Sequence, residues 1–135
     1  MRGKERREAL DKLRAIELFS DCSDDELEAI DGLLTELRFS EGQRITREGG
    51  GALEFIVIVD GMVSVIKGDE VVATVRAGSF VGELGLLDEQ TRNATVRATT
   101  TVRAFVLDAG EFERLLEISP SVRERIESTA SVRRD

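Results

Sequence analysis

The sequence predicts a mainly β fold with flanking helices: an eight-stranded jelly-roll β-barrel (double-stranded β-helix) with α-helices at both ends. The first observation is the spacing of apolar residues, which is helical over about 5–34, alternating over about 35–107 and helical again over about 109–132. The second is a set of about eight short β-rich runs separated by turn residues, a pattern typical of sandwiches and jelly rolls. The 135 residues suit a single domain over 1–135, because no repeat or linker interrupts the pattern.

Start signals place the predicted helices, two on each side of the β region. Ser23 and Glu26 have the spacing of a capping box, in which each side chain accepts a hydrogen bond from the backbone N–H of the other residue. Asp108 and Glu111 repeat this spacing after the last strand. Ser119-Pro120 then supplies an N-cap and a proline at the first helical position, which predicts a second C-terminal helix.

Two glycine dipeptides predict tight turns inside the β region. Asp60-Gly61 and Gly68-Asp69 separate the β-rich runs 55–59, 62–66 and 71–75. Glycine supplies the positive φ that two-residue hairpin loops require, so both dipeptides are predicted to be hairpin turns. Four apolar residues of these runs are predicted to belong to the core rather than to a ligand site: Phe55, Ile58, Val65 and Val72.

The composition excludes several kinds of chemistry. The chain has no histidine, which removes the commonest metal ligand and general base, and Ser-His-Asp or Cys-His catalysis with them. Cys22 is the single cysteine, so disulfide, zinc-cluster and iron–sulfur frameworks are excluded, and the residue is predicted to be a small buried apolar one. We therefore predict no metal and no cofactor.

The charge and the hydropathy make nucleic acid and membranes unsuitable partners. The formal net charge is −8, and a field of this sign opposes binding to phosphate backbones. No apolar run approaches the roughly 20 residues that span a bilayer, and the N-terminus lacks the hydrophobic region of a signal peptide. The sequence therefore predicts a cytoplasmic protein that does not bind nucleic acid directly.

The segment 78–96 carries the strongest functional signal. Its three glycines lie between two predicted strands, where the backbone can approach a ligand closely. The run 83–87 is long enough for one helical turn, whose free N–H groups would receive an anion, and the guanidinium of Arg92 can pair with two phosphate oxygens. Glu83 cannot bind the anion but can accept a hydrogen bond from a sugar hydroxyl. The segment therefore indicates a nucleotide with one phosphate charge and a free ribose hydroxyl.

This segment resembles the phosphate-binding cassette of cyclic nucleotide-binding domains, whose pattern runs F-G-E-(L/I)-A-L, a short spacer and then P-R-A-A-T-V. Here the pattern is Phe80-Val81-Gly82-Glu83-Leu84-Gly85-Leu86 and Thr91-Arg92-Asn93-Ala94-Thr95-Val96. Arg47-Glu48-Gly49 resembles the R-E-G turn of the family, and Gly61 resembles the glycine between its central strands. The resemblance extends from about Leu13 to Ile126.

The resemblance implies a role for each matching residue. Glu83 matches the glutamate that binds the ribose 2′-hydroxyl, and Arg92 matches the arginine that pairs with the cyclic phosphate. Leu84, Gly85 and Ala94 match positions whose backbone N–H groups point at the ligand. The implied ligand-binding residues are Gly82, Glu83, Leu84, Gly85, Arg92, Asn93 and Ala94.

Three residues depart from the family pattern. Thr91 replaces the usual proline, so the loop before Arg92 loses more entropy on ordering. Gly85 replaces the usual alanine and loosens the short helix by up to about 1 kcal/mol. Asn93 can both donate and accept hydrogen bonds, which leaves the choice of base open.

The predicted function is a sensor that binds a cyclic mononucleotide, with cAMP favoured over cGMP. Ligand binding is expected to draw residues 112–132 toward the barrel, and the residue over the base could be an aliphatic one or an arginine. The arginine candidates are Arg123, Arg125, Arg133 and Arg134. The charges from Glu111 to Arg134 are otherwise expected to form a solvated helix face, these four arginines included where they do not contact the base.

The main alternative is a degenerate cyclic nucleotide-binding fold that has lost its ligand. In that reading the fold acts in protein interaction or dimerisation, but a purely structural descendant has little reason to keep Glu83 and Arg92 as a pair. A structural ion pair between Glu83 and Arg92 at the rim of the barrel is a separate alternative to ligand contacts at these two residues. Catalysis is not expected, because no second carboxylate accompanies Glu83 in the cassette. In either case the terminal helices are the expected contact with an effector protein or a second copy.

Overall fold

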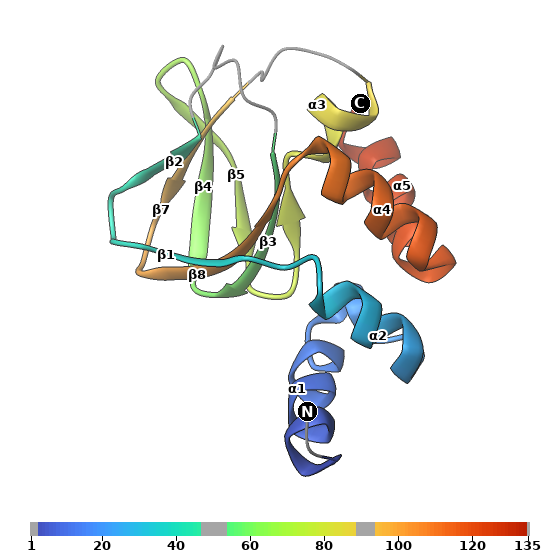
Figure 1. The fold of residues 1–135 in the computed structure, drawn as a ribbon. Helices are drawn as coiled ribbons and strands as arrows, with labels where there is room; N and C mark the ends of the chain where they lie inside the picture. Colours follow the sequence, from blue (N-terminus) through green and yellow to red (C-terminus); the bar gives the residue numbers. More distant parts are fainter. Residues whose placement is uncertain (1–2, 47–53, 89–93, 135) are drawn as a thin grey trace.

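Eight strands form the centre of the computed structural model, which describes residues 3–46, 54–88 and 94–134 (Figure 1). They are β1 (Glu36–Phe39), β2 (Arg44–Thr46), β3 (Phe55–Asp60), β4 (Met62–Lys67), β5 (Glu70–Arg76), β6 (Phe80–Val81), β7 (Thr95–Ala98) and β8 (Val102–Leu107). Four of them pair in the order β1-β8-β3-β6 and four in the order β2-β7-β4-β5, with antiparallel neighbours throughout. The predicted mainly β fold class is confirmed.

The helices lie at one side of the two sheets. They are α1 (Gly3–Arg14), the 3-10 helix η1 (Glu17–Phe19), α2 (Asp24–Asp31), α3 (Glu83–Leu87), α4 (Ala109–Ile118) and α5 (Pro120–Arg133) (Figure 1). Both predicted capping boxes are present, at Ser23 with Glu26 and at Asp108 with Glu111. The Ser119 side chain accepts from the N–H of Val122 at the start of α5, as predicted. Within the described ranges no helix combines the length and the apolar character needed to cross a membrane.

One of the two predicted hairpin turns is confirmed and the other is wrong. Gly68-Asp69 joins β4 to its antiparallel neighbour β5, with Lys67 opposite Glu70. Asp60-Gly61 joins no hairpin, because β3 pairs in one sheet and β4 in the other. The chain instead crosses between sheets at Gly61, which has φ +93° and where a Cβ would lie 2.3 Å from the carbonyl oxygen of Thr101. Glycine is required there because the backbone at Thr101 leaves no room for a Cβ atom.

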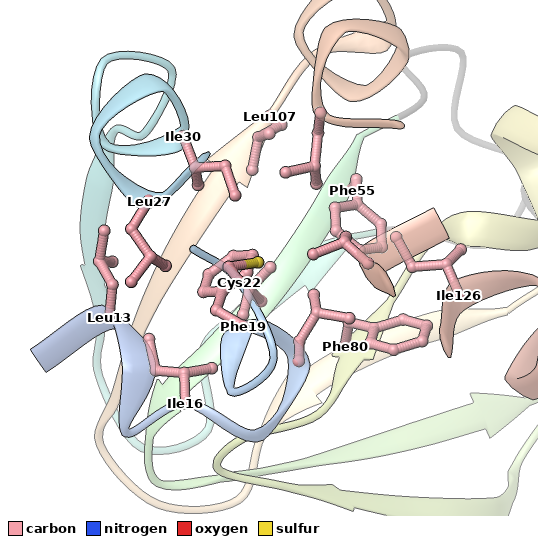
Figure 2. Packing of buried hydrophobic residues seen from close by; sticks show 14 of the residues in the cluster. Leu13, Ile16, Phe19, Cys22, Leu27, Ile30, Phe55, Phe80, Leu107 and Ile126 are labelled. Atoms are coloured by element: carbon pink, nitrogen blue, oxygen red, sulfur yellow. The ribbon is translucent and has the colours of Figure 1, made fainter. Parts of the chain in front are cut away.

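Two apolar clusters hold the fold together. One is formed by residues of both sheets, among them Ile58, Val63 and Val96. The other joins the helices to β3 and β8, as Figure 2 shows for Phe19, Phe55, Leu107 and Ile126 among others. Because both clusters include β3 residues, this strand is buried on both faces.

The core predictions are confirmed except at β5. Phe55 and Ile58 are buried, and Val65 is partly buried against the inter-sheet cluster. The prediction for Val72 is wrong: this residue is 50% exposed, because β5 is an edge strand. Cys22 is buried as predicted, with its Sγ 3.4 Å from the Oγ of Ser119.

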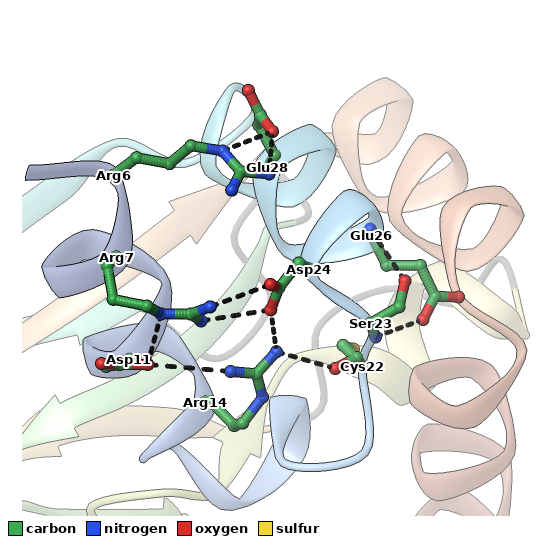
Figure 3. A network of polar contacts seen from close by, with 9 residues as sticks. All are labelled: Arg6, Arg7, Asp11, Arg14, Cys22, Ser23, Asp24, Glu26 and Glu28. Atoms are coloured by element: carbon green, nitrogen blue, oxygen red, sulfur yellow. Dashed lines mark hydrogen bonds and ion pairs between the residues drawn. The ribbon is translucent and has the colours of Figure 1, made fainter. Parts of the chain in front are cut away.

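A network of ion pairs joins α1 to α2 (Figure 3). Arg7 and Arg14 of the α1 helix both donate hydrogen bonds to the carboxylate of Asp24, and Arg6 donates to Glu28. Hydrogen bonds from Arg7 and then Arg14 hold the pKa of Asp24 well below its ordinary value of 3.8. The charged form of Asp24 is therefore favoured by folding.

Replacing Asp24 with asparagine is expected to lower the urea midpoint at neutral pH, because Arg7 and Arg14 lose their shared anion. A carboxyl whose pKa is depressed in the folded state stabilises above its unfolded pKa and loses that contribution as the pH falls. The difference between the wild type and Asp24→Asn should therefore shrink from about pH 5 downward. Asp31→Asn, at the other end of α2, is the control; an equal difference at acid and neutral pH would contradict the assignment.

Candidate functional site

The predicted cassette begins where β6 turns into α3. The turn residue is Gly82, the N-cap of α3, with φ +97° in the left-handed region. A Cβ at this position would lie 2.1 Å from the carbonyl oxygen of Glu54. The chain can therefore make this turn only with glycine, and the predicted short helix follows as α3.

Replacing Gly82 with alanine is expected to destabilise the protein by more than about 2 kcal/mol, since left-handed strain and the contact with Glu54 add together. Chemical denaturation measures the effect. Gly42→Ala is a matched control, because Gly42 also has positive φ, at +83°, but a Cβ there would have no neighbour within 4 Å. Equal losses of stability in Gly82→Ala and Gly42→Ala would show that the contact with Glu54 does not add to the destabilisation.

Glu83 is a buried carboxylate whose partner comes from the C-terminal helix. It is 1% exposed, although it stands at the first position of α3. The Nη1 of Arg133 lies 2.6 Å from its Oε1 and 2.9 Å from its Oε2. The guanidinium carbon of Arg133 also lies 5.1 Å from the centre of the Phe80 ring, within range of a cation–π interaction. One cation therefore contacts both oxygens of the carboxylate to which the resemblance assigns the ribose.

A second ion pair ties the same turn of α5 to the end of α3. Arg134 donates to both oxygens of Asp88, over 2.9 and 2.6 Å. These hydrogen bonds lower the pKa of the Asp88 carboxyl. We call the two pairs, Arg133–Glu83 and Arg134–Asp88, the α5 latch. The expectation that the charges over 111–134 form a solvated face is wrong at this turn.

The rest of α5 is held by a narrow apolar stripe. Its buried residues are Val122, Ile126 and Ala130, four residues apart along one face. On another side, Arg125 donates to the backbone oxygen of Glu17 and to the carboxylate of Asp21. A cavity of about 450 Å³ is lined by residues of α5, η1 and the turn before β6, among them Ser79, Phe80, Ser128 and Thr129. The latch thus adds two ion pairs to the apolar packing that holds the last turns of α5.

The structure describes most of the predicted ligand-binding residues. Gly82, Glu83, Leu84 and Gly85 lie together at the β6–α3 turn, and Ala94 is buried just before β7. The other two, Arg92 and Asn93, lie outside the described residues, as do Thr91 and 47–49 of the R-E-G turn.

The sequence did not identify Arg133 as the partner of Glu83; it indicated Arg133 only as one of four arginines that could lie over the base. The contact joins positions 50 residues apart, and each arginine carries the same charge on the same helix. Asp88 and Phe80 were not predicted as part of the site at all. The usable signal was the helical spacing of Val122, Ile126 and Ala130, which fixes the face of α5 that packs inward.

Comparison with known proteins agrees with the resemblance. The family model described as cyclic nucleotide-binding domain matches residues 36–119, more than half of the chain. Acetyltransferase Pat of Mycolicibacterium smegmatis is 34% identical over 110 residues, which cover 78% of this chain and 33% of Pat.

Solved structures extend the likeness to the helices. A cAMP-bound PfPKA-R matches with a TM-score of 0.78 and 28% identity, over 96% of this chain and 46% of that one. The regulatory subunit of a cAMP-independent protein kinase A from Trypanosoma brucei matches with a TM-score of 0.82 and 25% identity, over 95% and 46%. The chain thus spans about a third of Pat and less than half of either structure. With the family model, the cassette turn at Gly82 and the two-sheet fold in agreement, this chain belongs to the cyclic nucleotide-binding domain family.

Proposed function

We propose that this domain is a cAMP sensor in which the nucleotide and the C-terminal helix compete for Glu83. The observation that carries the proposal is that Arg133 donates hydrogen bonds to both carboxylate oxygens of Glu83. Glu83 is the residue that the cassette pattern assigns to the ribose. The family is one of non-catalytic regulatory modules. The ligand is cAMP, and its binding is transmitted through the end of α5.

The ligand is held by the residues of the cassette. Glu83 accepts a hydrogen bond from the ribose 2′-hydroxyl, and Arg92 pairs with the single phosphate charge. Backbone N–H groups of Leu84 and Gly85, in the first turn of α3, lack partners within the helix and are available to the ligand. The cAMP-bound state of PfPKA-R supports cAMP as the ligand.

Competition follows from burial. With 1% of Glu83 exposed and Arg133 on both of its oxygens, a ribose reaches the carboxylate only when the guanidinium leaves. A charge-assisted hydrogen bond contributes roughly 1.5–3 kcal/mol, so the bonds lost and gained are of similar size. Nucleotide binding therefore shifts a balance between two arrangements of the last turn of α5.

The movement is confined to the end of α5. Phe112 of α4 and Val122 of α5 are already buried against the barrel, so they have no further to close. The freed turn carries Arg133, Arg134 and the exposed Val132, a surface that an effector protein can read. The relatives that share this domain include an acetyltransferase and a kinase regulatory subunit, so one binding module serves different effectors.

Hydrogen–deuterium exchange with and without cAMP tests this function. We expect the amides of the last turn of α5 to exchange faster with cAMP, while those of β3 and β8 do not change. In parallel, cAMP should raise the melting temperature more than cGMP does. Slower exchange at the last turn of α5 with a raised melting temperature would contradict the competition but keep the ligand.

A protein interaction module that no longer needs nucleotide is the second candidate. Two observations favour it: Glu83 already has a full partner in Arg133, and the Trypanosoma brucei regulatory subunit belongs to a cAMP-independent kinase. The absence of any thermal shift with millimolar cAMP or cGMP would favour this function over the first.

A further inference from the structure

The strand β5 has an edge at which no other described strand pairs. It is the longest strand, at seven residues, and it lies at the end of the sheet order β2-β7-β4-β5, so among described strands it pairs only with β4. The outward N–H and C=O groups of an edge strand are a template for another strand. Proteins usually protect such an edge with charged residues or proline along it.

The side chains of β5 lack that protection. The five residues between Glu70 and Arg76 carry no charge and no proline, and three of them are valine. Val71 is 60% exposed and Val72 is 50% exposed, although β-branched residues favour paired strands. The protective feature that β5 does have is a register shift against β4 at Val72, which adds twist to the strand.

The charges at the ends of β5 select a partner. If two copies of β5 pair antiparallel about a two-fold axis at Ala73, then Glu70 of each copy lies opposite Arg76 of the other. Val71 then lies opposite Val75, and Val72 opposite Thr74. Within the described part of the chain, neither Glu70 nor Arg76 belongs to an ion pair, so both charges are available. The strand is self-complementary in this one register.

We propose that a second copy of this chain pairs with β5 edge to edge, forming a two-fold symmetric dimer with a continuous sheet. Such an interface presents the same strand from both copies, so it closes at two and does not propagate. It lies on the sheet that does not carry β6 and leaves the α5 latch uncovered. The dimer therefore does not depend on the proposed nucleotide binding.

Sedimentation velocity over a concentration series, on the full chain without nucleotide, tests the proposal with two charge reversals. Glu70→Arg alone and Arg76→Glu alone each place like charges opposite one another twice, so each should weaken dimerisation roughly tenfold or more. An equimolar mixture of the two variants restores two opposite-charge pairs and should dimerise as the wild type does. The controls are Glu41→Arg and Arg38→Glu, which make the same charge changes at exposed positions outside β5.

The mixture separates this register from any other interface. Dimerisation of the wild type, its loss in each variant and its return in the mixture support the proposal. A wild type that stays monomeric, single variants that dimerise normally, or a mixture that stays monomeric would each overturn it. The double variant Glu70→Arg/Arg76→Glu should also dimerise, which checks that the reversed side chains are compatible with a folded strand.

Discussion

Replacing Arg133 with alanine is expected to lower the stability of the protein without nucleotide and to raise its affinity for cAMP. Glu83 is buried and would lose the partner of its side-chain oxygens, which costs about 1–3 kcal/mol. For a domain of this size, the melting temperature should fall by about 3 °C or more. The nucleotide would no longer have to displace a guanidinium, so the affinity should rise roughly tenfold.

Arg123→Ala is the matched control for this variant. Arg123 lies on the same helix, and its replacement removes the same charge. Its ion pair, however, is with Glu127 of its own helix, and both side chains are more than half exposed. We expect its effect on stability to be below about 0.5 kcal/mol and its affinity for cAMP to be unchanged. If Arg133→Ala bound cAMP more weakly than the wild type, Arg133 would be a ligand contact and not a competitor.

Replacing Arg92 with alanine is expected to weaken cAMP binding well over tenfold. Arg92 is the cationic side chain that the cassette pattern aligns with the phosphate, and the bidentate pair it can form is among the stronger polar interactions. The protein as a whole is acidic, with a net charge of −8, so no general attraction would replace it. Calorimetric titration of the purified variant measures the loss.

Arg97→Ala shows whether a loss is specific to Arg92. Arg97 lies on β7, five residues further along, and its guanidinium donates to the carbonyl oxygen of Gly42 in the turn between β1 and β2. Its removal should leave the affinity for cAMP within about twofold. Unchanged binding by Arg92→Ala would remove the phosphate assignment, whatever Arg97→Ala does.

Most of the fold followed from local sequence signals. The capping boxes at Ser23 and Asp108 involve residues three positions apart, so the sequence alone identifies them. Gly68-Asp69 was correctly predicted to be a hairpin turn, because that prediction also rests on adjacent residues. Asp60-Gly61 has equivalent residues, but its role depends on which distant strands β3 and β4 pair with, and that information is not local. The exposure of Val72 likewise depends on β5 having no neighbour on one side.

The candidate site also has one part that local sequence predicts and one part that depends on contacts between distant residues. The glycine at position 82 and the short helix after it were predictable, because the turn chemistry and helix spacing are contained in ten residues. The partner of Glu83 was not, because it comes from α5, which β7, β8 and α4 separate from α3 in the sequence. The sequence suggested Arg92 as the ion-pair partner of Glu83 and offered Arg133 only as a candidate for the residue over the base; the packing of α5 through its buried residues Ile126 and Ala130 brings Arg133 to the carboxylate.

The central claim is that Glu83 binds the ribose of a cyclic nucleotide, and calorimetric titration with cAMP and its 2′-deoxy analogue tests it most directly. The two ligands share the base and the cyclic phosphate, so they differ only at the hydroxyl that Glu83 should accept from. We predict single-site binding of cAMP and an affinity at least tenfold lower for the 2′-deoxy analogue, the loss of one hydrogen bond to a charged group. Equal affinity for the two ligands would contradict the account.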